Sequence, residues 1–271
     1  MKVHKQKLVR AWRLACAFHY LLVILIIVPI IFHPIARKAP KRRQFASLLY
    51  RRFYNALNIK LIIEGTPTQE TALWVCNHIS WLDILLLAGN NTVDFIAKTE
   101  VGDWPLIGYI VKRAGTLLIE RDNKFQAYRA LPKLQERIKK GVPVLIFPEG
   151  TTSNGSTTLA FKPMFYQAAV RENILIQPIS LQYFDMSGKI TESVAFINDD
   201  DISTSLKRIL DQPKITAIIQ FLPVVSAANH HRKQLATMNR QSIVKSQVPH
   251  SFMNTHTNPH NSALQLSKIQ G

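Results

Sequence analysis

The sequence has little cysteine, little glycine and no acidic residue at either end of the chain. Two cysteines among 271 residues exclude a disulfide framework and a cysteine-based zinc site, and they fit a reducing compartment. Ten glycines and 14 prolines exclude a collagen-like or Pro/Gly-rich chain. A hydrophobic fraction of 47% with 19% charged residues excludes a wholly disordered one. Long apolar runs are also scarce, because only residues 14–32 form one.

The surplus of positive charge lies at the two ends of the chain. Residues 1–60 hold 13 Lys and Arg and no acid, and residues 212–271 hold six and no acid. Residues 61–211 hold 15 Lys and Arg together with all 17 acids. A formal charge of +17 by itself suggests a nucleic-acid partner. The nearly neutral middle argues against it, so we expect no nucleic acid; a non-catalytic basic membrane or nucleic-acid adaptor is the remote alternative.

Residues 1–60 are predicted to be a basic, membrane-associated helical segment. The apolar run of 19 residues spans roughly 28 Å as a helix, which barely crosses the hydrocarbon core of a bilayer. Lys and Arg flank it on both sides, which favours a helix that enters and returns in one leaflet beside anionic headgroups. A single membrane span, a cleaved signal peptide and a buried core helix are the alternatives.

A second stretch of this segment has the pattern of a helix lying in the membrane interface. Arg51 and Arg52 lie away from an apolar stripe. That stripe consists of Phe45, Leu48, Leu49, Phe53, Ala56 and Leu57.

Residues 61–225 are predicted to form one α/β domain, a mixed sheet flanked by helices on both faces. Strand-like runs occur at 61–64, 72–76, 93–97, 116–119, 142–147 and 174–179. Helical patterns occur at 84–88, 105–113, 124–140 and 163–171. Residues 226–271 are rich in Asn, His, Ser and Gln, and we interpret them as a polar, disordered tail.

One histidine, His78, lies in this α/β domain, directly after the strand predicted at 72–76. Open α/β sheets place ligands at such strand-to-helix turns. If Ser80 caps the following helix, Asp83 lies in its first turn, where the carboxylate could reach back to the imidazole. Such a pair offers general-base catalysis. The alternative is a capping-box-like helix start in which Asp83 is purely structural.

Phe147 to Ser153, in the sequence FPEGTTS, follow another predicted buried strand. Gly150, Thr151 and Ser153 offer N–H groups and hydroxyls for a polyol or oxyanion, and Glu149 offers an acceptor for hydroxyls. An ordinary Pro-Glu-Gly turn is the alternative.

A third motif, GTLLIER at residues 115–121, ends in Arg121, which is either a solvated charge or a phosphate ligand. No protein nucleophile is evident: there is no G-x-S-x-G motif, and Cys76 lies within a predicted buried strand. We therefore expect the attacking group to be the substrate's own alcohol. No metal is expected, because no second metal ligand lies near His78.

Taken together and in this order, NHISWLD, GTLLIER, FPEGTTS and a later strand ending in QPI resemble the four blocks of the PlsC-type glycerolipid acyltransferases, the 1-acylglycerol-3-phosphate O-acyltransferases. The resemblance covers roughly residues 60–185. It implies that His78 is the general base that activates a glycerol hydroxyl, and that Asp83 orients it.

The resemblance also implies roles for other residues and for two substrates. Arg121 would be a phosphate ligand, Glu149 and Gly150 part of the acceptor site, and Lys98 a further basic position. The donor would be an acyl thioester of coenzyme A or acyl carrier protein, transferred directly and with no cofactor. The acceptor would be lysophosphatidic acid, in phospholipid biosynthesis. The expected location is the membrane, at the cytoplasmic face of a bacterial inner membrane.

One position departs from the family's pattern. The third block commonly reads FPEGTRS, with an arginine that helps to hold the acceptor's phosphate, whereas this chain has Thr152 there. A hydroxyl in place of a bidentate donor should weaken recognition of a phosphomonoester. FPEGTTS is similar to the block of lyso-ornithine-lipid and some lysophospholipid acyltransferases, so lyso-ornithine lipid or another lysophospholipid is the alternative acceptor.

Overall fold

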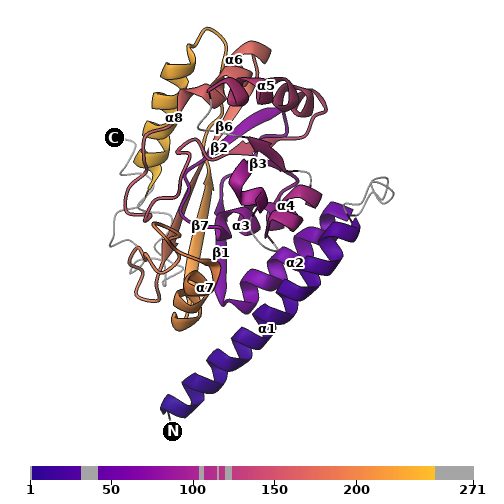
Figure 1. Ribbon diagram of the computed structural model, residues 1–271. Helices are drawn as coiled ribbons and strands as arrows, with labels where there is room; N and C mark the ends of the chain where they lie inside the picture. The colour runs from indigo at the N-terminus through magenta and orange to yellow at the C-terminus, as the bar shows by residue number, and fades with distance from the viewer. Residues whose placement is uncertain (1, 32–41, 104–106, 115, 120–123, 248–271) are drawn as a thin grey trace.

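The computed structural model describes residues 2–31, 42–103, 107–114, 116–119 and 124–247, and shows a mixed β-sheet between two layers of helices (Figure 1). Within these residues the sheet has eight strands in the order β1-β7-β6-β2-β5-β3-β4, with β8 paired to β6. The strands are β1 Ile59–Glu64, β2 Ala72–Cys76, β3 Asp94–Lys98, β4 Leu117–Ile119, β5 Val144–Ile146, β6 Leu175–Phe184, β7 Ile215–Phe221 and β8 Val225–Ser226. The helices are α1 Lys2–Ile31, α2 Arg42–Ala56, α3 Leu82–Asn90, α4 Ile107–Ala114, α5 Lys124–Lys139, α6 Tyr166–Glu172, α7 Ile202–Asp211 and α8 Arg232–Ser246, and there are 3-10 turns at Thr99–Asp103 and Pro163–Phe165.

Strands β4, β3, β5, β2 and β6 run parallel, as expected for strands joined by helices. Strand β7 is antiparallel to β6, and β1 is parallel to β7. The predicted mixed α/β sheet is therefore confirmed. No predicted element corresponds to α7 or β7, and the direction of β7 sets β7 and β1 antiparallel to the rest of that strand order.

Side chains alternate between the two faces of β2, the central strand. Ala72, Trp74 and Cys76 join the core that packs under α1, α2, α3 and α7. Leu73 and Val75 join the core that packs under α5, α6 and α8. Because all five residues are buried, β2 reads as a continuous apolar run. Its carboxyl end is thus held rigidly between both layers.

The N-terminal segment forms two helices that lie side by side along the domain, and the amino end of α1 projects beyond it (Figure 1). Leu8–Val28 is a helix long and apolar enough to cross a membrane, with a mean hydropathy of 2.1. Most of that stretch is exposed, including Trp12, Phe18 and Ile26, so the alternative of a buried core helix is wrong.

The stripe on α2 differs in part from the prediction of an interfacial helix. Leu49, Phe53 and Leu57 are buried in the core of the domain, whereas Phe45 and Leu48 are exposed. An apolar stripe on a helix indicates a buried face but does not say what buries it. On α2 the buried part of the stripe packs against α3 and the sheet, and not against lipid.

Arg13 joins α1 to the body of the protein. Its guanidinium is buried and donates to the carbonyl oxygens of Leu57 at 2.6 Å and Gln212 at 2.8 Å. These carbonyls follow the ends of α2 and α7, so one cation satisfies the open ends of two helices.

The prediction of a disordered tail is wrong for residues 232–246, which form α8. Leu235, Ala236 and Ile243 are buried against the sheet at helical spacing. The side chains of His231 and Gln234 close a capping box at the start of the helix. The sequence pattern does not predict this helix, because its buried face is narrow and most of its residues are polar. Residues 248–271 lie outside the described part of the chain.

Candidate active site

Two loops meet where β2 and β5 end. The strands are parallel neighbours with Val75 opposite Ile146, so the residues that follow each strand leave the sheet at the same edge. One loop carries His78 and the other carries FPEGTTS. The geometry explains how residues about 70 positions apart in the sequence reach one site.

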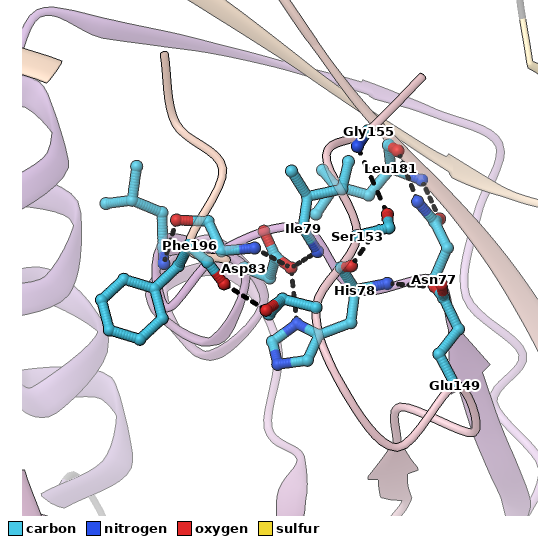
Figure 2. Close-up of polar contacts among 12 residues, drawn as sticks. Asn77, His78, Ile79, Asp83, Glu149, Ser153, Gly155, Leu181 and Phe196 are labelled. Atoms are coloured by element: carbon cyan, nitrogen blue, oxygen red, sulfur yellow. Dashed lines mark hydrogen bonds and ion pairs between the residues drawn. The ribbon is translucent and has the colours of Figure 1, made fainter. Parts of the chain in front are cut away.

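His78 and Asp83 are in contact, as their spacing predicted. Nδ1 of His78 lies 2.7 Å from Oδ2 of Asp83, and the carboxylate is fully buried (Figure 2). The same oxygen accepts the main-chain N–H groups of Ile79 at 2.7 Å and Ser80 at 3.0 Å. Helix α3 begins at Leu82, one residue later than a Ser80 cap implies. Asp83 therefore both closes the start of the helix and holds the imidazole.

The face of the imidazole ring is packed as well. Its ring stacks on Phe147 with centroids 3.8 Å apart and planes 11° from parallel. Figure 2 shows the second ring nitrogen directed away from the carboxylate. The His78 side chain is 16% exposed, so this nitrogen can be reached from outside while the rest of the ring is packed.

Two further side chains, for which the sequence predicted no role, complete this arrangement. Tyr183 on β6 donates its hydroxyl to Oδ1 of Asp83 at 2.7 Å. Burial and the nearby carboxylate raise the pKa of Tyr183 well above its ordinary value, so the phenol stays a donor. Asn77 exchanges two hydrogen bonds with the main chain of Leu181 at 2.8 and 2.9 Å, which ties the His78 loop to β6.

Glu149 joins the two loops through main-chain contacts. Oε1 accepts the N–H of His78 at 2.7 Å, and Oε2 accepts the N–H of Leu159 at 2.8 Å. Burial raises the pKa of Glu149 from the ordinary 4.5 to about 7, and the two N–H donors partly oppose that rise. Both oxygens thus contact protein N–H groups. The role of Glu149 toward a substrate hydroxyl stays a prediction.

The remaining FPEGTTS residues also make internal contacts. Ser153 donates its N–H to the carbonyl of His78 at 2.8 Å. Thr152 donates its hydroxyl to the carbonyl of Phe196, and Thr151 is exposed. Gly150 has a φ of +77°, a conformation that glycine adopts without strain, and Lys162 packs across it.

Two predicted site residues cannot be placed against this centre. Arg121 lies outside the described residues, and of Lys98, which ends β3, only the main chain is described.

Cys76, two residues before His78, is buried at the end of β2, and its burial raises the pKa of the thiol well above its ordinary value. The reactive thiolate is therefore suppressed at neutral pH. Among the described residues no group of three His, Cys, Asp or Glu side chains is placed to hold a metal ion.

The chain resembles known proteins over this same region. Residues 58–182 match the family model described as Acyltransferase. A lyso-ornithine lipid O-acyltransferase of Pseudomonas aeruginosa is 32% identical over 210 residues, which are 78% of this chain and 81% of that protein. A 1-acyl-sn-glycerol-3-phosphate acyltransferase of Neisseria gonorrhoeae is 34% identical over 176 residues, 64% of this chain and 68% of that protein.

A solved structure shows the same fold. The 1-acyl-sn-glycerophosphate acyltransferase PlsC of Thermotoga maritima superposes with a TM-score of 0.62 at 20% identity, over 92% of this chain and 100% of that one. The matched region contains His78, Asp83 and the FPEGTTS block. By sequence, this chain belongs to the acyltransferase family that includes the lyso-ornithine lipid and 1-acylglycerol-3-phosphate enzymes.

Proposed function

We propose that this acyltransferase moves an acyl chain from a thioester directly to the free hydroxyl of a lysolipid, with His78 as the general base. The observation that carries the proposal is the contact between His78 and Asp83. A carboxylate can only accept, so a 2.7 Å contact at Nδ1 places the ring proton there. That tautomer leaves Nε2, the nitrogen directed away from Asp83, as the basic one (Figure 2).

The chemistry follows from that tautomer. Nε2 of His78 takes the proton of the acceptor's hydroxyl as its oxygen attacks the thioester carbonyl carbon, and Asp83 stabilises the imidazolium that forms. When the tetrahedral intermediate collapses, the C–S bond breaks and the thiolate leaves, taking the proton back from the imidazolium. The ester and the free thiol are the products. Because the thiol of Cys76 stays protonated, it is a poor nucleophile for forming an acyl-enzyme, and this supports direct transfer.

An apolar cavity next to helix α3, the helix that carries Asp83, would suit an acyl chain, although His78, Asp83 and the FPEGTTS residues do not line it. The cavity has a volume of about 180 Å³ and lies between α1, α2, α3, α4 and α7. Trp81, Ile84 and Leu85, next to Asp83 along the chain, line it on one side. The donor would be acyl-CoA or an acyl carrier protein thioester. Its thioester group would have to reach the exposed edge of His78.

Lysophosphatidic acid is the first candidate for the acceptor, because relatives that cover most of the domain are 1-acyl-sn-glycerol-3-phosphate acyltransferases. Lyso-ornithine lipid is the second, and Thr152 is the observation that favours it. The hydroxyl of Thr152 holds Phe196, so this position supplies no bidentate cation to a phosphate. Relatives named lyso-ornithine lipid O-acyltransferase are equally similar in sequence.

The exposed apolar helix supports action at a membrane. Leu8, Trp12 and Phe18 of α1 are exposed, and Phe45 and Leu48 of α2 are exposed too. Basic residues on the same two helices suit anionic headgroups. We place the enzyme at the cytoplasmic face of a bacterial inner membrane, where a soluble thioester and a lysolipid can both reach His78.

The test is thiol release from acyl-CoA by the full-length protein in mixed micelles, with lysophosphatidic acid and lyso-ornithine lipid compared at a fixed donor concentration. His78→Ala should lose activity by about 10³-fold or more. His230→Ala, on a loop after β8, is the matched control and should match the wild type. Wild-type rates in His78→Ala would refute the proposed base.

A second variant separates the two roles of Asp83. Asp83→Asn keeps the volume and an acceptor for the N–H groups of Ile79 and Ser80, but it no longer stabilises an imidazolium. We expect a fall in kcat of about 10³- to 10⁴-fold. An unchanged rate would show that Asp83 acts only as a helix cap.

A further inference from the structure

Helix α8, at the far end of the described chain, holds the loop that follows the FPEGTTS block. Nε of Arg240 donates to the carbonyls of Thr158 at 3.1 Å and Leu159 at 2.8 Å, and Nη2 donates to Thr158 at 2.6 Å. The amide of Gln247 donates to the hydroxyl of Thr158 at 2.9 Å. Thr158 is 2% exposed, so these contacts fix a buried peptide.

The same loop contacts the active site through Glu149. The N–H of Leu159 donates to one oxygen of Glu149, and the N–H of His78 donates to the other, at 2.8 and 2.7 Å (Figure 2 shows the His78 contact). A continuous series of hydrogen bonds therefore joins Arg240, the Thr158–Leu159 peptide, Glu149 and the main chain of His78.

This series requires an ionised Glu149. A carboxylate accepts at both oxygens, whereas a carboxylic acid directs an O–H at one of the two N–H groups and cannot accept both equally. Burial favours the acid form, and the positive charge of Arg240 favours the carboxylate. The charged and titratable groups around Glu149 are Asp83 of α3, Cys76 of β2, His78 of the first loop, Lys162 across the FPEGTTS turn and Arg240 of α8.

We propose that Arg240 is a positioning residue for the acyl transfer: it fixes the Thr158–Leu159 peptide, and through that peptide it fixes Glu149, which holds the main chain of His78 in place. This inference rests on the proposed function, in which His78 is the base. It assigns a role in the active site to α8, whose Arg240 lies about 160 residues from His78 along the chain.

The proposal predicts a specific pH dependence. Protonation of Glu149 releases one of its two N–H contacts, so activity falls as pH falls through about 7, the pKa of Glu149. Without the charge of Arg240 that pKa rises further, and the fall in activity moves to higher pH. A general base also loses activity when it is protonated, so the shift has to be assigned to Glu149 by a second substitution.

The experiment measures thiol release by the full-length enzyme between pH 6 and 9 for Arg240→Gln, Arg240→Lys and Lys233→Gln. Lys233 is exposed on the same helix, in its first turn, where a cation gives the helix dipole no support, so Lys233→Gln removes the same charge without weakening α8. We expect Arg240→Gln to lower kcat at pH 7 by about 10- to 100-fold, with KM for the donor within about twofold. Arg240→Lys should keep the pH profile and recover part of kcat, and Lys233→Gln should match the wild type.

Glu149→Gln identifies the group that titrates. In a Glu149→Gln background, Arg240→Gln should shift the pH profile no further, because the carboxyl that responds to Arg240 is gone. An equal shift with and without Glu149 would overturn the proposal. So would a loss in Arg240→Gln that is the same at every pH.

Hydrogen exchange separates this proposal from the proposed function. Amides of residues 156–162 should exchange faster in Arg240→Gln than in Lys233→Gln, whether or not any lysolipid is a substrate. If the wild-type protein acylates no lysolipid while Arg240→Gln still shows this faster exchange, the proposed function is refuted and the Arg240 contact stands. Unchanged exchange together with unchanged kcat in Arg240→Gln would refute the positioning role alone.

Discussion

Tyr183 donates its hydroxyl to Oδ1 of Asp83 at 2.7 Å, while Oδ2 of the same carboxylate faces His78. The two oxygens of Asp83 thus have different partners, one on β6 and the other in the loop after β2. Because both Tyr183 and Asp83 are buried, this contact is shielded from water, which strengthens it. It links the orientation of the imidazole to the central sheet.

Tyr183→Phe should lower activity with little change in fold. The substitution removes one hydrogen bond to a charged group, worth about 1.5–3 kcal/mol, and leaves Oδ1 of Asp83 without this donor, while Oδ2 keeps its three contacts. We expect a fall in kcat of roughly tenfold and an unchanged KM. Tyr166→Phe is the matched control, because the buried hydroxyl of Tyr166 has no hydrogen-bond partner among the described residues. Equal effects of the two substitutions on kcat would show that Tyr183 does not orient Asp83.

Gly150→Ala and Gly141→Ala form a second matched pair. Both glycines have positive φ, +77° and +75°, so alanine costs each about 1–2 kcal/mol of stability. A Cβ at Gly150 would lie 2.7 Å from Nζ of Lys162, whereas one at Gly141 would meet nothing within 4 Å. The midpoint temperature of thermal unfolding should fall by a similar amount in both variants, and the rate of thiol release should fall only in Gly150→Ala. Full activity in Gly150→Ala would show that the turn tolerates displacement.

The His78–Asp83 contact could be predicted from the sequence because it is local. Five residues and a strand-to-helix turn determine it, and both features are visible in the letters NHISWLD. The contacts of Tyr183 with Asp83 and of Arg240 with Thr158 span 100 and 82 residues. They depend on which strands pair and where α8 docks, and no local pattern encodes either.

Helix α8 and the stripe of α2 show two limits of hydropathy patterns. Asn239 lies on the buried face of α8, where its side chain donates to the carbonyl of Leu235 at 2.7 Å, so the apolar period is interrupted by a polar residue. The stripe of α2 has a clear period, but a period does not distinguish lipid from protein. Leu49 and Phe53 meet the sheet layer, and Phe45 does not.

Stability and activity should respond to pH in opposite directions near neutrality. The pKa of Glu149 is about 7 in the folded protein and 4.5 ordinarily, so the folded state binds the proton more tightly. The resulting stabilisation is complete below about pH 4.5 and is lost as pH rises through about 7, a change of a few kcal/mol. Urea unfolding of the wild type and Glu149→Gln should give a stability difference that varies over this range. A difference independent of pH would contradict the raised pKa.

Thr152→Arg tests what determines the acceptor. An arginine at this position restores the FPEGTRS form and offers a bidentate donor to a phosphomonoester, whereas lyso-ornithine lipid carries no phosphate for it to bind. The ratio of kcat/KM for lysophosphatidic acid to that for lyso-ornithine lipid should therefore rise by about tenfold or more. Thr152→Val removes the hydroxyl that holds Phe196 without adding a cation, so it should lower both rates and leave the ratio unchanged. If Thr152→Arg and Thr152→Val change the ratio alike, the loop that contains Phe196, and not the missing cation, selects the acceptor.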